Sequence, residues 1–256
     1  MSHIIPPSRI HTHTIILLHG RDSTAEEFAE EFFESRTSDN RSLTEIFPHA
    51  RWVFPQSDIR YSVRFGSDMT QWFDMWSTEN PRAEEHIQSE GLRKSVQYIQ
   101  QCVQIEKALV PLSRIILGGI SQGCAAAVWS LLCANYTLGG FIGFSGWMPR
   151  EEILRNSGDD MGLICDIEAC LGDTQRDQYI SPGPAATATP VFISHCRDDE
   201  VVPIEHGLAM SNTLRERGAR VTWKEYETGG HWIQEPQGID DLVNFMKHSM
   251  VRMHRL

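Results

Sequence analysis

Short runs of β-branched and aliphatic residues recur along the chain, separated by segments with helical periodicity. The runs cover residues 12–18, 50–54, 113–118, 139–145, 190–195 and 220–227. We expect each run to form a strand, since a short apolar run bounded by turn residues is typical of a buried strand. Strands that are apolar throughout and alternate with helices indicate a parallel sheet, because each crossover places a helix on one face. The pattern predicts an α/β fold with a mostly parallel central sheet and helices on both faces.

Two of the intervening segments carry further helix signals. One has an apolar stripe at helical spacing and is followed by Pro111 as a stop signal; the stripe consists of Leu92, Val96, Ile99 and Val103. The other begins at Ser23, whose hydroxyl we expect to cap the first turn while Glu26 reaches back to it.

Length and charge narrow the classes of protein further. A chain of 256 residues with 41% hydrophobic content can bury a sizeable core, and we expect a single domain over residues 1–256. The net charge of -11 repels phosphate backbones and anionic membranes, so we expect no nucleic-acid partner. The apolar runs are too short for a signal-peptide core or a transmembrane helix, which predicts a cytoplasmic protein. We expect the 6 cysteines to be reduced and mostly buried, with a Cys165–Cys170 pair as the less favoured alternative.

One serine stands between an apolar run and a helix-forming segment, in the stretch ILGGISQGCAA at residues 116–126. Residues 119–123 fit the pattern G-x-S-x-G, which marks a tight strand-to-helix turn that exposes a serine hydroxyl. A chain of this length contains the pentapeptide by chance about one time in ten, so other residues must support it. In a parallel sheet, ligands collect at the carboxyl ends of the strands, where Ser121 would lie. Ser121 is therefore a candidate nucleophile.

A serine hydroxyl is activated when an imidazole accepts its proton and a carboxylate orients that imidazole. After a G-x-S-x-G serine, the acid and then the histidine follow on later loops. The loop after the fifth run supplies Asp198 and Asp199, and from these residues alone either could be the acid. The loop after the sixth run places His231 beyond a Gly-Gly pair. Position and chain order make His231 the candidate base, and a structural loop histidine is the alternative.

The oxyanion of an acyl-transfer intermediate needs backbone hydrogen-bond donors. The amide of Gln122 follows the nucleophile at the start of a helix and can supply one. The amide of Arg21, in the loop after the first run, can supply a second, although an ordinary turn before a helix cap explains that loop equally well. The histidines at 11–13 have no partner at ligand spacing, so we expect no metal site.

Six segments occur in a characteristic order: LLHGRDS, QWFDMWS, GGISQG, GFSGWMP, DDEVVP and GGHW. In these motifs the sequence resembles the acyl-protein thioesterase/carboxylesterase family of α/β-hydrolases, also called the phospholipase/carboxylesterase family. The resemblance covers most of the chain. It implies an α/β-hydrolase fold and a serine hydrolase, without a cofactor, that cleaves acyl esters or thioesters, S-acylated proteins among them. The family's acid precedes an aliphatic pair and a proline, which selects Asp199 over Asp198.

The resemblance also implies residues beside the acyl pocket. The family's WFD segment carries over to Trp72, Phe73 and Asp74, and its S-x-W-x-P turn carries over to Trp147. Core packing is the alternative for each, since a tryptophan in an α/β protein of this size is more often structural.

The chain departs from the family pattern after its HG, where Arg21 and Asp22 replace small or apolar residues. Arg21 could meet a substrate carboxylate or pair with Asp22. Residues 150–189 look longer than the family's link, and we expect either a surface insertion or a lid over the acyl pocket formed by Leu163, Ile164, Ile167 and Leu171. A noncatalytic module that binds an acylated ligand is the alternative to an enzyme, although the intact serine, acid and base argue against it.

Overall fold

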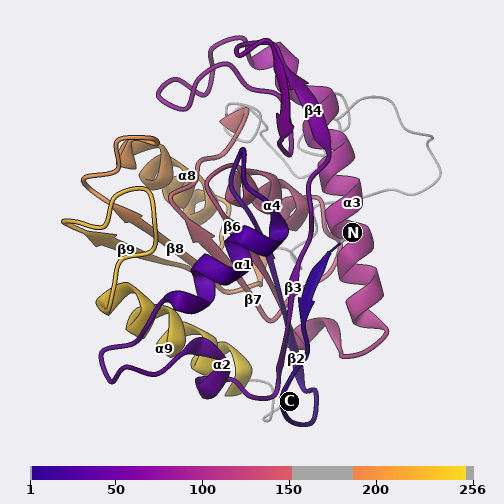
Figure 1. The fold of residues 1–256 in the computed structure, drawn as a ribbon, viewed down its shortest axis with the longest axis vertical. Helices are drawn as coiled ribbons and strands as arrows, with labels where there is room; N and C mark the ends of the chain where they lie inside the picture. The colour runs from indigo at the N-terminus through magenta and orange to yellow at the C-terminus, as the bar shows by residue number, and fades with distance from the viewer. Residues whose placement is uncertain (1, 152–186, 252–256) are drawn as a thin grey trace.

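The computed structural model describes residues 2–151 and 187–251. Within them, a seven-stranded sheet has the order β1-β3-β2-β6-β7-β8-β9 (Figure 1). Its strands are β1 (His3–Ile5), β2 (His13–Leu18), β3 (Ala50–Phe54), β6 (Ile115–Ile120), β7 (Gly140–Phe144), β8 (Val191–Cys196) and β9 (Val221–Tyr226). β1 is antiparallel to β3, and the other neighbouring strands are parallel. The prediction of a mostly parallel central sheet is confirmed.

Six of these strands coincide with the six apolar runs, whereas β1 and a two-stranded hairpin were not expected from the sequence. The hairpin pairs β4 (Ile59–Ser62) with β5 (Ser67–Thr70). It lies near one end of the molecule, beside the end of α3 (Ser89–Lys107), as Figure 1 shows. Most side chains of the hairpin are exposed, so it lacks the apolar run by which the other strands were found.

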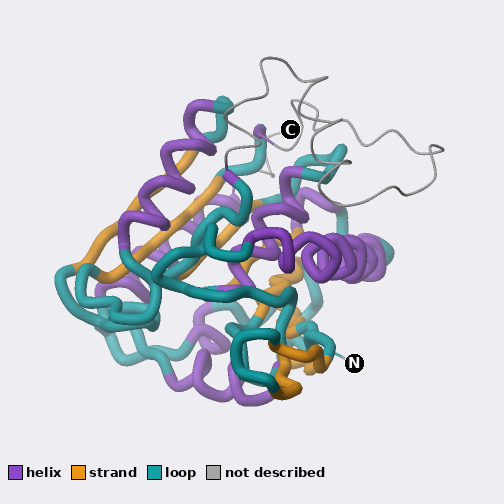
Figure 2. Tube along the Cα trace, turned by 90° about the horizontal axis from the view of Figure 1, so that it is seen from above, coloured by secondary structure: helices purple, strands orange, loops and turns teal. Residues whose placement is uncertain are grey.

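Helices cover both faces of the sheet, and each face has its own apolar core (Figure 2). α3, α4 (Gln122–Leu132) and α8 (Ile204–Glu216) contribute to one core, together with Ile16 and Leu18 of β2. α1 (Ala25–Glu34), α2 (Leu43–Ile46) and α9 (Gln237–Val251) contribute to the other, together with Ile15 and Leu17. Successive residues of a strand point to opposite faces, so both faces require apolar side chains. Short 3-10 turns occur at η1 (Glu85–Gln88) and η2 (Leu112–Arg114).

The cap of α1 differs from the predicted one by a single residue. The Thr24 hydroxyl, rather than that of Ser23, accepts a hydrogen bond from the Glu27 amide, and the Glu27 carboxylate accepts one from the Thr24 amide. The sequence STAEE offers a hydroxyl and a carboxylate three residues apart at two adjacent registers, so the capping pattern alone was ambiguous. The structure corrects the Ser23–Glu26 prediction.

α4 is the most deeply placed helix among those described, because every one of its residues is buried. It follows β6 directly and packs against β6, β7 and α3. Small side chains over residues 123–127 allow this close approach to the sheet. The turn that joins β6 to α4 is therefore held firmly from both sides. Within residues 2–151 and 187–251, no helix is both long and apolar enough to cross a lipid bilayer.

Candidate active site

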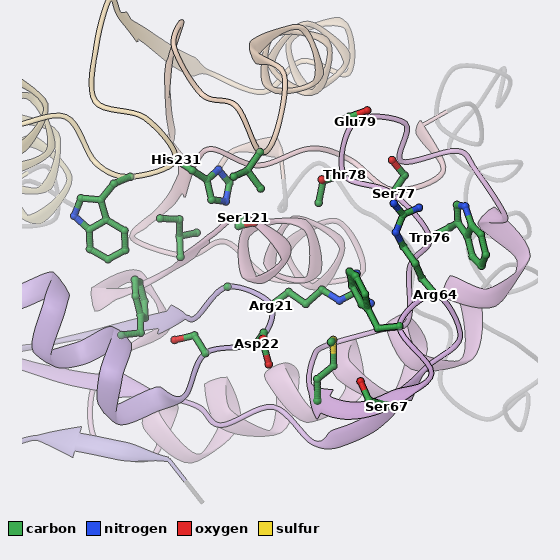
Figure 3. Close-up of a pocket in the computed structure, with 18 of the residues that line it drawn as sticks. Arg21, Asp22, Arg64, Ser67, Trp76, Ser77, Thr78, Glu79, Ser121 and His231 are labelled. Carbon is green, nitrogen blue, oxygen red and sulfur yellow. The ribbon is translucent and has the colours of Figure 1, made fainter.

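The carboxyl ends of the parallel strands meet at one edge of the sheet, and the loops that follow them carry the predicted site residues. In register, Leu18 of β2 lies beside Gly119 of β6, and Phe144 of β7 lies beside both Ile120 and Ser194. The segments after β2, β6, β8 and β9 consequently converge. Ser121 and His231, from two of these segments, face the same pocket (Figure 3).

Ser121 occupies the sharp turn between β6 and α4. Its backbone has φ 55° and ψ -125°, a strained conformation for a residue with a side chain. A Cβ on Gly119 would lie 2.8 Å from the Leu18 carbonyl oxygen, and one on Gly123 would lie 2.4 Å from the same oxygen. Only glycine fits at both positions. The Ser121 amide donates to the Phe144 carbonyl at 2.9 Å, which fixes the turn against β7.

Asp199 and His231 are directly paired. His231 Nδ1 lies 2.8 Å from Oδ2 and 3.0 Å from Oδ1 of Asp199. The amides of Val201 and Val202 both donate to Oδ1 at 2.9 Å. Burial alone would raise the pKa of Asp199, but hydrogen bonds from His195, His231 and the Val202 amide outweigh it and hold that pKa well below its ordinary value. The carboxylate is therefore ionised and oriented toward Nδ1 of His231.

The neighbouring Asp198 has a different contact. Its carboxylate accepts the amides of Gly229 at 3.2 Å and Gly230 at 2.8 Å. Both glycines have positive φ, 144° and 63°, which favours glycine in this turn before His231. The two acids left open by the loop sequence are thus distinguished by geometry, since Asp199 contacts the imidazole and Asp198 holds the loop that carries it.

Ser121 and His231 line one pocket, but no hydrogen bond joins their side chains in the part of the chain that the structure describes. In unliganded sites such bonds are often long and tighten only when substrate binds. The serine is 7% exposed, so its hydroxyl is reachable from the pocket. Proton transfer between the two residues remains a prediction.

The loop after β2 runs beside Ser121. A Cβ on Gly20 would lie 3.6 Å from the Ser121 Cβ, which places the backbone of residues 19–21 close to the nucleophile. His19 fixes the loop because its Nδ1 donates to the Gly20 carbonyl at 2.7 Å and its Nε2 accepts the Ser57 amide at 3.1 Å. Burial lowers the pKa of His19, which favours this neutral tautomer.

The two predicted oxyanion donors are the amides of Arg21 and Gln122. Neither amide has a backbone or side-chain acceptor among the described residues. The Gln122 amide opens α4, where the helix dipole favours negative charge.

The Arg21 side chain points away from Ser121 toward the β4–β5 hairpin (Figure 3). Its guanidinium donates to Ser62 Oγ at 2.8 Å and Gln71 Oε1 at 3.1 Å, and it lies 3.6 Å from Asp74 Oδ1. The side chain of Arg21 is thus paired with a carboxylate of the chain itself, but this carboxylate belongs to Asp74 and not to Asp22 as expected. The Asp22 amide instead donates to the Thr70 carbonyl at 2.8 Å.

The pocket at Ser121 has a volume of about 700 Å³. Its walls come from the loop after β2, from α1, from the β4–β5 hairpin and residues 76–79, and from the loops that hold Val201 and His231. The wall is mainly apolar, through Phe28, Phe65, Met69, Trp76, Ile120, Val201 and Trp232. Arg64 adds charge at the hairpin side, and Glu79 adds charge in the segment of residues 76–79 (Figure 3).

Trp72, Phe73 and Trp147, which the resemblance places beside the acyl pocket, are buried in the core at 1%, 0% and 1% exposure and are not among the described residues that line the pocket at Ser121. The Gln122 side chain draws the chain inward because it accepts the Trp72 amide at 2.9 Å and donates to the Phe73 carbonyl at 2.7 Å. The Trp72 indole donates to the His19 carbonyl. Trp72 and Phe73 therefore contact the site through Gln122 and His19. Asp74 is not among the described residues that line the pocket, whereas Arg21, whose guanidinium lies 3.6 Å from the Asp74 carboxylate, is one of them.

The sequence patterns did not point to His195 or to the hairpin residues of the pocket. His195 is the last residue but one of β8, and its Nε2 lies 3.1 Å from the Asp199 carboxylate. The sequence signal that could have pointed to His195 is its position near the end of a predicted strand, four residues before a candidate acid. The predicted lid residues 163–171 and the Cys165–Cys170 pair lie outside the described residues. Among the described cysteines, Cys102, Cys124, Cys133 and Cys196 are free and buried. Within that part of the chain, no group of three His, Cys, Asp or Glu residues is arranged to hold a metal ion.

Comparison with known proteins identifies the family of this chain. A family model described as Phospholipase/Carboxylesterase matches residues 1–183 and 180–250. The chain belongs to the phospholipase/carboxylesterase family. This membership confirms the expected serine hydrolase and the α/β-hydrolase fold.

Several proteins that carry the name acyl-protein thioesterase are similar to this chain in sequence. Acyl-protein thioesterase 1 of Gibberella zeae is 29% identical over 252 residues, which span 96% of this chain and 94% of the relative. Acyl-protein thioesterase 1 of Aspergillus fumigatus is 28% identical over 253 residues, 96% and 91% of the two chains. Among solved structures, Zea mays acyl-protein thioesterase 2 has a TM-score of 0.72 at 23% identity, covering 98% of this chain and 99% of its own. Esterase PE8 has a TM-score of 0.68 at 20% identity, covering 96% and 97%.

Proposed function

We propose that this chain hydrolyses acyl esters or thioesters through a triad of Ser121, His231 and Asp199. One observation carries the proposal: His231 is paired through Nδ1 with Asp199 and shares a pocket with a serine held in a strained strand-to-helix turn. This pairing leaves Nε2 of His231 as the atom that accepts the serine proton. The ionised state of Asp199 supports its role in stabilising the imidazolium.

The reaction has two halves. In the first, Ser121 Oγ attacks the acyl carbonyl carbon while His231 Nε2 takes its proton, and the carbonyl electrons move onto the oxygen. The amides of Arg21 and Gln122 donate to this oxyanion. When the intermediate collapses, the bond to the leaving oxygen or sulfur breaks, and His231 returns the proton to that atom. In the second half, water loses a proton to His231 and attacks the carbonyl carbon of the acyl-serine. The bond between that carbon and Ser121 Oγ then breaks, His231 returns the proton to Oγ, and the carboxylic acid leaves.

The substrate class that fits best is an acyl ester or thioester, S-acylated proteins included. Relatives that carry the name acyl-protein thioesterase 1 align along nearly the whole chain and support this choice. A pocket of about 700 Å³ falls within the range of small-molecule sites. Each methylene that its apolar wall buries contributes roughly 0.8 kcal/mol of binding.

A fluorophosphonate probe tests the proposal directly. We expect stoichiometric labelling at Ser121 that is abolished in Ser121→Ala, because only an activated serine attacks the probe. Turnover of an aryl ester should fall on the order of a million-fold in that variant. A tenfold loss or less would contradict the assignment.

A parallel initial-rate panel, from aryl acetate to aryl palmitate beside an S-acyl peptide, measures the preference for chain length and leaving group. We expect turnover on at least one member. If well-folded wild-type protein neither reacts with the probe nor turns over any substrate, a noncatalytic module that binds acylated ligands becomes the better interpretation.

A further inference from the structure

The Asp199 carboxylate contacts two histidines. Besides His231, His195 Nε2 lies 3.1 Å from Oδ2 of Asp199 and 2.8 Å from the Val202 carbonyl oxygen. Both neighbours of this nitrogen are acceptors, so we assign its hydrogen to Nε2, which donates to the Val202 carbonyl and faces the Asp199 carboxylate. The carboxylate therefore contacts His195 as well as His231.

The surroundings of His195 restrict its ring. The residue is 1% exposed, at the end of β8, and its ring packs 6.5 Å from that of Trp223. On the opposite edge, a Cβ on Gly207 of α8 would come within 2.4 Å of Nδ1, so α8 approaches this edge closely. Nδ1 is buried and has no hydrogen-bond partner among the described residues. A buried polar atom without a partner carries an energetic cost, which the donor at Nε2 must offset.

We propose that His195 is a positioning residue for the proposed hydrolysis: its Nε2–H fixes the Asp199 carboxylate so that the acid stays aligned with His231. This inference rests on the proposed function. Among the described residues, His195 is not part of the pocket lining, and it would act through Asp199. Its bridge to the Val202 carbonyl also ties the acid to the backbone of its own loop, whose amides hold Oδ1. The carboxylate thus contacts both histidines and the amides of Val201 and Val202, which together restrain its orientation.

His195→Phe removes the donor and keeps most of the ring volume. We expect kcat to fall on the order of 10- to 100-fold, because small misplacements of catalytic groups have effects of this size, while KM stays within about threefold. His195→Gln, whose amide nitrogen reaches the same place, should recover most of kcat. Phe192→Leu is the matched control, since it lies on the same strand but packs on Phe144 and Phe245. It should lower the melting temperature and leave kcat nearly unchanged.

An NMR measurement separates failure of this inference from failure of the proposed function. The Nδ1–H proton of His231 should give a downfield resonance in wild-type protein and in His195→Gln, and the signal should broaden or move upfield in His195→Phe. This readout requires no turnover, so it applies even if the substrate panel shows no activity. Wild-type kcat in His195→Phe, equal impairment of the Phe and Gln variants, or an unaltered resonance in His195→Phe would each overturn the positioning role.

Discussion

The two adjacent acidic residues after β8, Asp198 and Asp199, make different contacts. Asp199 Oδ2 lies 2.8 Å from His231 Nδ1, whereas Asp198 accepts two amides of the turn that carries His231. Their position in the loop could not separate them, because both follow the same strand and both are polar loop residues; only the resemblance to the family motif pointed to Asp199. The distinction depends on which carboxylate turns inward, and the amides of Val201 and Val202 select Asp199.

This difference predicts unequal effects of two matched substitutions. Asp199→Asn should lower kcat by about 10⁴-fold, since an amide favours the wrong tautomer of the imidazole. Asp198→Asn keeps an acceptor for the glycine amides and should lower kcat by about tenfold or less. Initial rates on an aryl ester, with protein concentration set by active-site titration, measure both. A larger loss in Asp198→Asn than in Asp199→Asn would reverse the assignment of the acid.

Among the elements, the β4–β5 hairpin and the loop after β2 are joined through Arg21. The side chain of Arg21 bonds the hairpin residue Ser62 and also Gln71, and the Asp22 amide bonds Thr70 at the end of β5. The hairpin was not predictable from apolar runs, because Arg60, Arg64 and Asp68 interrupt it and most of its surface faces solvent. Tertiary contacts, rather than a buried face, place it at the pocket.

Loss of this connection should loosen the loop that supplies an oxyanion amide. Arg21→Leu keeps the backbone amide but removes the bonds to Ser62, Gln71 and Asp74. We expect faster hydrogen–deuterium exchange over residues 20–22 and 62–71, and a fall in kcat on the order of tenfold. Arg64→Leu is the control for exchange, because Arg64 stacks only on Phe65 and Trp76 among the described residues. Equal exchange in wild-type and Arg21→Leu protein would argue against the connection.

At the scale of the whole molecule, parallel strand ends bring distant segments of the chain to one edge of the sheet. This arrangement was predictable because strands buried on both faces leave continuous apolar runs, and because Ser121 and the acids each follow such a run. His231 follows β9, an edge strand whose residues are partly buried or exposed. The local wall of the pocket was not predictable in the same way. Trp72 and Phe73 were expected beside the substrate, but the Gln122 side chain holds their backbone inward. His195 was missed because a histidine that ends a buried strand carries no periodic signal.

Stability of the folded protein should depend on Asp199 at acidic pH. Its pKa is depressed on folding, so its ionised form stabilises the folded state fully above the ordinary aspartate pKa of about 3.9. The contribution is lost as pH falls below that value toward the lower folded pKa. Urea unfolding should therefore show that wild-type protein exceeds Asp199→Asn in free energy of unfolding at about pH 6, and that this difference narrows at about pH 3. A difference that stays constant over this range would contradict the prediction.

The hydrogen bonds of Asp198 and Asp199 to residues 229–231 have a consequence for chimeras made between this chain and its relatives. Two successive residues after β8 bind three successive residues after β9, through two amides and one imidazole. These loops are separate in sequence, yet their hydrogen bonds join them. A chimera that exchanges only one loop pairs it with a loop from a different protein, so these hydrogen bonds are at risk. A chimera that exchanges both loops keeps the pair together.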